Sequence, residues 1–238
     1  MQSRAKAGPG SGRLASNQFD IMADGRKPRA ERAARTPPHL PPVDRLDRRR
    51  TPLLNPDRLA LIADWFREAE QAAEAGNVFD AFFKLWMSFN GWASAVSLEE
   101  RDSAIIDAAA KDLDLRAAFN QLRAEDAEFE ETLLRFVREW PVYSETKAYN
   151  KYYALHHRYP PDLDALRAFC EDDPDSARKP TRHREGIIDW ENTLRVVYQV
   201  RCNFVHGGKG PSLHRDRVLV ECSYRVLHRI IVFARLLW

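Results

Sequence analysis

The sequence predicts an all-α protein. Apolar residues recur at intervals of three and four through most of residues 53–238, the spacing that places them on one side of a helix. Alternation with a period of two, which is typical of a half-buried strand, is missing at any useful length. We therefore expect a single helical domain over residues 53–238, preceded by a tail over residues 1–52.

The tail is basic and rich in proline. Residues 1–50 hold six of the fourteen prolines, carry a net charge of +7 and have almost no aromatic residues. This composition buries too little apolar surface to offset chain entropy, which predicts disorder. We interpret the arginine-rich block 45–50 as a solvated tail, with contact to RNA or an acidic partner as the alternative. Met22 is a second candidate for the true start.

Residues 51–238 have a net charge of −5. Such a body lacks a broad positive surface, so any contact with nucleic acid must be local. The three cysteines lack metal-ligand spacing and indicate reduced thiols in a cytoplasmic protein. No apolar run reaches the roughly 18 residues of a membrane span, so we expect no contact with a membrane.

Local signals define the first two helices. Asn55-Pro56 supplies a cap and a first-turn proline for a helix over about 57–75, and Gly76-Asn77 ends it. The next helix, over about 78–96, is unusually aromatic. We interpret it as a core helix, in preference to a cofactor cage or a base-stacking platform.

The rest of the chain continues in helices. Two or three short ones are expected over 98–140, where Trp140-Pro141 ends them, and Asp162 begins another. A polar loop is predicted over 171–184. Two helices, over about 186–206 and 214–237, close the chain.

The penultimate helix contains an anomaly at Arg201. Its apolar face is made by Ile187, Trp190, Leu194, Val197 and Phe204, and Arg201 falls near the middle of that face. A buried guanidinium is costly unless it is paired. We expect either a carboxylate partner, from Asp189, Glu191 or an earlier helix, or a cleft or two-fold interface lined by the cation.

His206 follows Arg201 by five positions, just before Gly207-Gly208, which permit a left-handed helix end. The negative end of the helix dipole favours a protonated imidazole there, which suits proton transfer near neutral pH. The alternative is a histidine that caps the terminal carbonyls. The two side chains diverge by about 140° around one helix, so joint action would require a second chain.

This segment resembles a known family signature. Arg201, four residues, His206 and then Gly207-Gly208-Lys209 on the penultimate helix resemble the Arg-x4–6-His motif of the HEPN (higher eukaryote and prokaryote nucleotide-binding) family. The segment FDAFFKLWMSFNGW over 79–92 is similar to the second helix of the Apea-like HEPN branch, and Trp140-Pro141 fits the same branch. The resemblance covers about 57–238.

The resemblance implies an up-down helical bundle that forms a homodimer through its C-terminal helices. In active members the arginine and histidine of both chains build a metal-independent endoribonuclease site. His206 would then assist attack of a ribose 2′-hydroxyl on the adjacent phosphate, and Arg201 would stabilise the phosphorane-like transition state. A 2′,3′-cyclic phosphate would result. An antitoxin or a nucleotidyltransferase is the implied partner, in toxin–antitoxin or antiphage defence.

One position departs from the motif. Active members carry a polar residue directly after the arginine, where this chain has Cys202 and then Asn203. Either Asn203 takes the polar role or the site has degenerated. Two other hypotheses therefore stay open: a non-catalytic HEPN module that binds a nucleotide, RNA or a partner protein, and a helical scaffold in which Arg201 is an internal ion pair.

Other candidate groups carry less chemistry. Lys209 is a candidate phosphate contact or a solvated loop cation. Four arginines of the last helix are expected to form a solvated face, or alternatively a basic rim for RNA: Arg215, Arg217, Arg225 and Arg229. No HxxxH, CxxC or phosphate-cradling glycine motif is found, which predicts neither a metal nor a cofactor.

Overall fold

A computed structural model describes residues 55–172, 187–206, 210 and 213–237. Within these residues the chain forms nine α-helices and no strand, which confirms the all-α prediction. The predicted tail over 1–52 lies outside the described residues, as does most of the predicted loop over 171–184.

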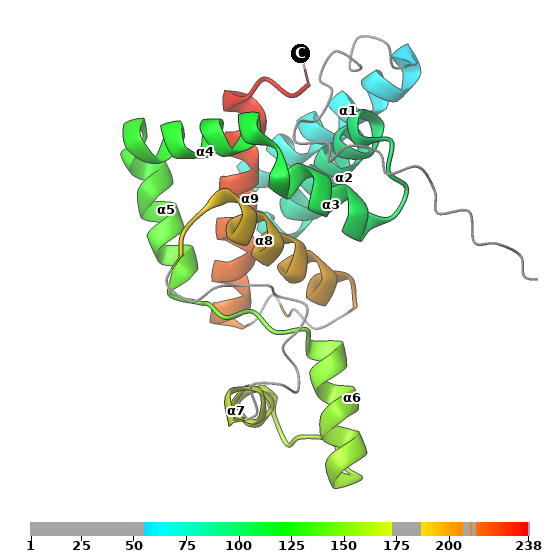
Figure 1. The fold of residues 1–238 in the computed structure, drawn as a ribbon, viewed down its shortest axis with the longest axis vertical. Coiled ribbons are helices and arrows are strands. Elements are labelled where there is room, and N and C mark those ends of the chain that lie inside the picture. The colour runs from blue at the N-terminus through cyan, green and yellow to red at the C-terminus, as the bar shows by residue number, and fades with distance from the viewer. Residues whose placement is uncertain (1–54, 173–186, 207–209, 211–212, 238) are drawn as a thin grey trace, which may run out of the picture. The chain divides into compact units, whose positions relative to one another are not determined.

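The helices follow one another along the chain as Figure 1 shows. Their bounds are α1 Pro56–Glu74, α2 Val78–Ser97, α3 Asp102–Lys111, α4 Leu113–Glu125, α5 Ala127–Val137, α6 Glu145–His156, α7 Leu163–Asp172, α8 Trp190–Val205 and α9 His214–Phe233.

Short-range hydrogen bonds explain most of these boundaries. The side chain of Asn55 accepts from the Asp57 N–H at 2.9 Å, which caps α1 as predicted. Gly76 then takes a positive φ of 76°, a conformation that glycine adopts without strain, and the chain turns into α2. Asp112 and Asp126 cap α4 and α5 in the same way, through the N–H groups three residues on.

The structure differs from the sequence-based prediction in four places. Helix α6 was not expected, because of its twelve residues only Ala148 is buried and its apolar pattern is weak. Helix α7 continues through Asp172, two residues into the predicted loop. Helix α8 begins at Trp190, since Asp189 supplies its cap, and α9 ends at Phe233, four residues early.

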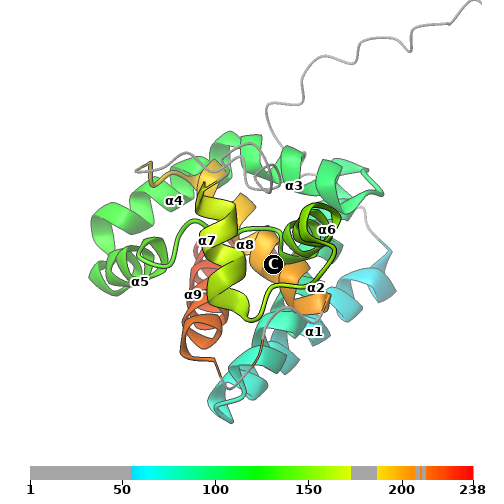
Figure 2. The same cartoon turned by 90° about the horizontal axis from the view of Figure 1, so that it is seen from below.

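The aromatic helix α2 lies in the main hydrophobic core, as predicted. Five of its large side chains are at most 1% exposed: Phe82, Leu85, Trp86, Phe89 and Trp92. Helix α2 packs against α1, α3 and α9 (Figure 2). Burial of these large apolar side chains stabilises the fold.

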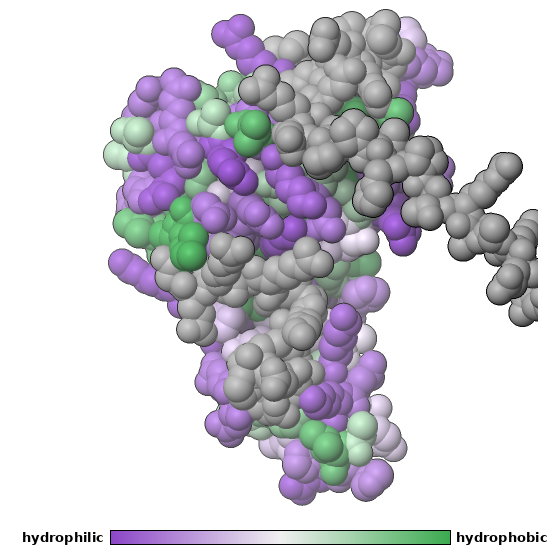
Figure 3. All heavy atoms as spheres, viewed as in Figure 1, coloured by the Kyte–Doolittle hydropathy of each residue, from purple (hydrophilic) through white to green (hydrophobic). Residues whose placement is uncertain are grey.

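Helix α8 is enclosed by neighbouring helices and carries the candidate site at its C-terminal end. It packs against α3, α4 and α9, and the Trp190 indole N–H donates to the Ala109 carbonyl at 2.8 Å. Helices α6 and α7 form a smaller cluster around Ala148, Leu166 and Cys170. Polar residues dominate the coloured surface in Figure 3, with apolar residues in small separate patches.

None of the helices in the described ranges combines the length and the apolar character that a membrane-spanning helix needs.

Candidate functional site

Arg201 has a carboxylate partner from an earlier helix. Its Nη2 lies 3.1 Å from Oδ2 of Asp102, in the first turn of α3, and its guanidinium carbon lies 5.7 Å from the ring centroid of Trp86. The side chain is 23% exposed, so the cation lies at the edge of the core. An ion pair and a cation–π contact therefore offset the cost of placing a charge on an apolar face.

Asp189 and Glu191, the two nearby carboxylates predicted as partners of Arg201, make other contacts. The Asp189 carboxylate caps the helix by accepting from the Asn192 N–H at 2.7 Å. Glu191 accepts from Arg195, one turn further along. Helix packing brings Asp102 to Arg201 across 99 positions of sequence, and no local pattern could have selected it.

His206 is exposed at the C-cap of α8. Its backbone N–H donates to the Cys202 carbonyl at 3.1 Å, whereas no described residue hydrogen-bonds its imidazole. The ring lines two cavities of about 440 and 300 Å³. It is therefore available to a ligand. The predicted left-handed end at Gly207-Gly208 and the candidate phosphate contact Lys209 lie outside the described residues.

None of the cavities found among the described residues is lined by both Arg201 and His206. Arg201 lines neither of the two cavities that contain His206, in agreement with the divergence expected from their spacing. Between them lie the half-buried Phe204, which packs edge-to-face on Phe83 of α2, and the exposed Val205. Joint action of the two groups on one substrate would require a second chain.

Asn203 forms a buried hydrogen-bonding centre. Its Oδ1 accepts from Gln199 Nε2 at 2.8 Å and from the Glu145 N–H at 3.3 Å. Its Nδ2 donates to the Tyr143 carbonyl at 2.7 Å and to Glu145 Oε1 at 3.3 Å. The amide thereby joins α8 to the chain entering α6, and its hydrogen-bonding capacity is filled within the protomer. The catalytic role of Asn203 stays a prediction.

Arg195 lines the same cavity as His206, and the sequence did not predict this. It lies on the same side of α8 as Gln199, Cys202 and His206, because positions 4, 7 and 11 apart nearly superimpose on a helix. Asp107 pairs with Arg195 at 2.6 Å and Glu191 does so at 3.1 Å. The signal for this side of α8 in the sequence is the repeat of polar residues at helical spacing.

The wall of the larger cavity also includes Tyr198, which stacks on Trp86 with ring centroids 5.8 Å apart. Burial raises the pKa of the Tyr198 phenol, and the neighbouring Cys202 adds to this shift. Tyr198 is therefore a neutral group at neutral pH and contributes no charge to the cavity.

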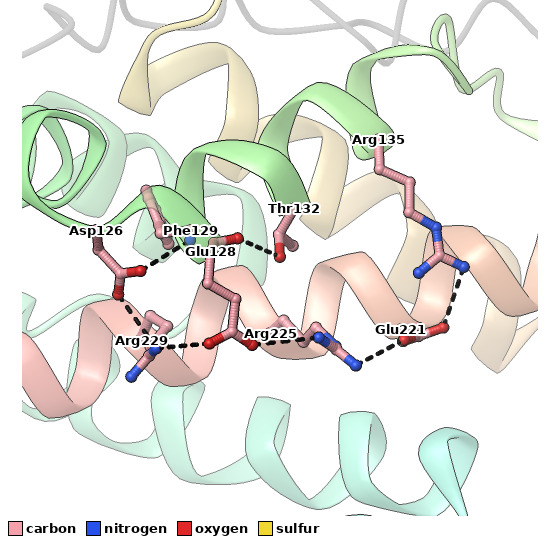
Figure 4. Close-up of polar contacts among 8 residues, drawn as sticks. All are labelled: Asp126, Glu128, Phe129, Thr132, Arg135, Glu221, Arg225 and Arg229. Carbon is pink, nitrogen blue, oxygen red and sulfur yellow. Dashed lines mark hydrogen bonds and ion pairs between the residues drawn. The ribbon is translucent and has the colours of Figure 1, made fainter.

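The arginines of α9 are matched by carboxylates. Figure 4 shows a ladder in which Arg229 contacts Asp126 and Glu128, Arg225 contacts Glu128 and Glu221, and Arg135 contacts Glu221. Separately, Arg215 pairs with Glu139 at 3.3 Å and donates to the Glu139 and Pro141 carbonyls, and burial lowers its pKa. Four arginines of α9 were predicted as a solvated face or a basic rim for RNA, and only Arg217 among them has no carboxylate partner within the described residues. The arginines of α9 therefore offer little surplus positive charge for RNA.

In the described ranges no group of three or more His, Cys, Asp or Glu side chains is arranged to hold a metal ion. The side chains of the adjacent His156 and His157 have different surroundings. His156 packs on the Tyr152 ring, with centroids 4.4 Å apart, and His157 ends α6 at a positive φ of 52°.

Comparisons of the chain with protein-family models, with curated proteins and with solved structures gave no significant match.

Proposed function

We propose that this protein is a HEPN-like, up-down helical bundle whose homodimer cleaves RNA without a metal ion. The observation that carries the proposal is the placement of Arg201 and His206. The imidazole is exposed at the end of α8, the guanidinium emerges on another side, and an apolar surface lies between them. A two-fold partner that covers this surface would bring the His206 of one chain towards the Arg201 of the other.

The apolar surface is formed by α2 and the end of α8. Its exposed members are Phe83, Met87 and Val205, around the half-buried Phe204. Helix α9 is less suited to dimer contact, because its inner side is buried in the core and Arg225 and Arg229 form ion pairs with α5 (Figure 4). The proposed dimer therefore uses α8 and α2.

In this site His206 accepts the proton of the ribose 2′-hydroxyl as its oxygen attacks the adjacent phosphorus. The bond from phosphorus to the 5′-oxygen breaks, the leaving oxygen takes a proton from solvent, and a 2′,3′-cyclic phosphate and a 5′-hydroxyl form. Arg201 stabilises the extra negative charge in the transition state. To do so it exchanges Asp102 for phosphate, and partial exposure of that ion pair keeps the exchange inexpensive.

The test is cleavage of single-stranded RNA in EDTA. Both His206→Ala and Arg201→Ala should lose at least about 100-fold in rate. The matched control is His214→Ala, an exposed histidine at the start of α9, which should cleave like the parent. Equal cleavage by His206→Ala and the parent would refute the assignment.

Mixing the two inactive variants tests whether the site is shared between chains. In a heterodimer of Arg201→Ala with His206→Ala, one shared site keeps both groups. The equimolar mixture should therefore regain about a quarter of the parental activity by two-fold symmetry. A site contained within one chain would show no recovery.

The second candidate is a non-catalytic module that binds a nucleotide, RNA or a partner protein such as an antitoxin or a nucleotidyltransferase. The Arg201–Asp102 ion pair favours it, because the cation is already neutralised in the protomer. This candidate predicts no cleavage, together with saturable binding that Arg201→Ala abolishes.

A further inference from the structure

Helix α6 exposes aromatic side chains that the hydrophobic core does not use. Of its twelve residues only Ala148 is buried, and α7 packs against it in a cluster separate from the main core (Figure 1). Tyr153 is 47% exposed, and Tyr159, just beyond the helix, is 68% exposed. Large rings stabilise a fold mainly through burial, so the fold gains little from these two.

The two exposed rings form a pair. His157 ends α6 at a positive φ of 52°, and two residues later the Tyr159 ring packs on Tyr153, with centroids 5.1 Å apart and planes inclined by 32°. Tyrosine offers a large contact area with few rotatable bonds, and packing of one ring on the other restricts both further. The pair is therefore a preorganised surface on which a planar ligand, such as a nucleobase, can stack.

The charge along α6 is positive. Residues 145–162 carry a net charge of +1 when both flanking acids, Glu145 and Asp162, are counted and the two histidines are taken as neutral, whereas residues 51–238 carry −5. Lys147 and Arg158 are exposed and form no ion pair with another described residue. Cations without a partner beside exposed rings on an acidic protein favour a local contact with a polyanion that also has planar groups.

The two acids are committed to contacts at the ends of this segment. Glu145 accepts from the Asn203 amide where α6 begins, and Asp162 accepts from the Ala165 N–H at the start of α7. Neither forms an ion pair with Arg158, which lies directly beside Tyr159 in the sequence.

The first turn of α6 also lies beside the proposed catalytic histidine. Thr146 and Lys147 line the same cavity of about 440 Å³ as His206. From Lys147 to the end of the helix at His156 the rise is about 14 Å, at 1.5 Å per residue. Helix α6 therefore connects the surroundings of His206 with the exposed tyrosine pair.

We propose that α6 binds single-stranded RNA next to the cleavage site. Bases stack on the Tyr153–Tyr159 pair, and Lys147 and Arg158 contact phosphates. Aromatic stacking combined with cations holds single strands with little dependence on sequence, because every base has a flat face. The inference rests on the proposed ribonuclease function and extends it to residues outside the Arg-x4-His segment.

Binding of a fluorescein-labelled oligouridylate of about ten nucleotides, measured by fluorescence anisotropy, tests the proposal. Methyl groups on its 2′-oxygens prevent cleavage, so binding is measured whether or not the protein is a ribonuclease. Tyr159→Ala should weaken binding about tenfold, whereas Tyr159→Phe, which keeps the ring, should bind within about twofold of the parent. Arg158→Gln should lower the slope of log Kd against log salt concentration by about 0.7, the value for one phosphate contact on a single strand.

The matched controls are on α1, which contributes nothing to this surface. Arg58→Gln removes an exposed positive charge and Leu61→Ala removes an exposed apolar side chain, and both should bind the oligomer like the parent. Annealing the oligomer to its complement withdraws the bases from stacking and should weaken binding. Equal affinity for the single strand and the duplex would overturn the proposal.

Failure of this inference is distinguishable from failure of the proposed function. If the parent cleaves RNA but Tyr159→Ala changes neither the affinity for the oligomer nor the KM for RNA, the inference is wrong and the ribonuclease stands. If the oligomer binds in a Tyr159-dependent way and RNA is not cleaved, the α6 assignment stands and the ribonuclease does not. If Tyr159→Ala lowers the mass of the protein in light scattering and leaves the affinity unchanged, the surface contacts protein and the inference is wrong.

Discussion

The guanidinium of Arg201 on α8 pairs with the carboxylate of Asp102 in the first turn of α3, at 3.1 Å. The other oxygen of that carboxylate accepts from Asn90 of α2 at 3.4 Å. One acidic side chain therefore joins three helices, and its position at the helix N-terminus is favourable for a negative charge. This ion pair reduces the free-energy cost of placing the Arg201 guanidinium at the edge of the core.

Breaking this pair from the two sides should have unequal effects. Asp102→Asn leaves a partly buried cation without its carboxylate and should lower the free energy of unfolding by about 1 kcal/mol, a value reduced for exposure. Arg201→Leu places an apolar side chain on an apolar face and should change it by less than about 0.5 kcal/mol. Urea denaturation measures both. The control Asp64→Asn, which breaks the exposed pair with Arg67, should have no measurable effect.

If Arg201→Leu instead costs as much as Asp102→Asn, the ion pair is a net stabilising element. That outcome would count against the scaffold hypothesis, in which Arg201 is an internal ion pair and its replacement by leucine preserves or raises stability.

Replacement of Asn203 should loosen the junction between α8 and α6. Asn203→Ala removes the hydrogen bonds that this amide makes with the Tyr143 carbonyl and the Glu145 N–H in a partly buried region, which should cost about 2–3 kcal/mol. Hydrogen exchange should accelerate mainly over 142–172, whereas α2 stays protected. Asn120→Ala, on the exposed side of α4, is the matched control and should be neutral. Uniform acceleration throughout the chain would contradict the local role.

The free energy of unfolding should decrease in acid, in part because Glu130 becomes protonated. Its carboxylate accepts from Arg123 at 2.8 and 2.9 Å, and this hydrogen bonding lowers the pKa of Glu130 below its ordinary value of 4.5. The stabilisation is therefore fully present above pH 4.5 and is lost as the pH falls through the lower folded pKa, because the unfolded chain takes up the proton first. Denaturation experiments across this pH range should show that the free energy of unfolding decreases less steeply with falling pH in Glu130→Gln than in the parent.

Arg123→Met removes the cause of the pKa shift and should flatten the same acid limb. It also removes the donor to the Ile188 carbonyl, so its stability at neutral pH should be lower than that of Glu130→Gln. If the free energy of unfolding of both variants decreases with falling pH as steeply as that of the parent, other carboxyl groups control acid unfolding.

The three thiols should react at different rates. Burial raises the pKa of Cys170 and of Cys222 to about 11, whereas Cys202 is only partly buried at the cavity wall. Iodoacetamide near neutral pH should modify Cys202 at least about 100-fold faster than the other two, since alkylation needs an accessible thiolate. Peptide mass spectrometry of the native protein gives the three rates, and the denatured protein, in which all three react, is the control. Similar native rates would contradict the described packing.

Local features of the sequence were sufficient for the helical framework. Asn55 and Gly76 marked the ends of α1, and the aromatic residues of α2 identified a core helix. These predictions succeeded because caps, turns and periodicity depend on neighbours a few residues apart. Helix α6 was missed because packing of Ala148 and the hydrogen bonds to Asn203 position it, and neither leaves a periodic signal.

The sequence by itself determined that Arg201 and His206 point in different directions and that Arg201 needs a partner. Only the tertiary structure decided that the partner is Asp102, that Asn203 is committed to the α6 junction and that Arg195 shares a cavity with His206. The physical reason is the sequence separation of the residues that interact. The turn of one helix relates residues a few positions apart, whereas the meeting of a guanidinium with a carboxylate 99 positions away depends on how whole helices pack.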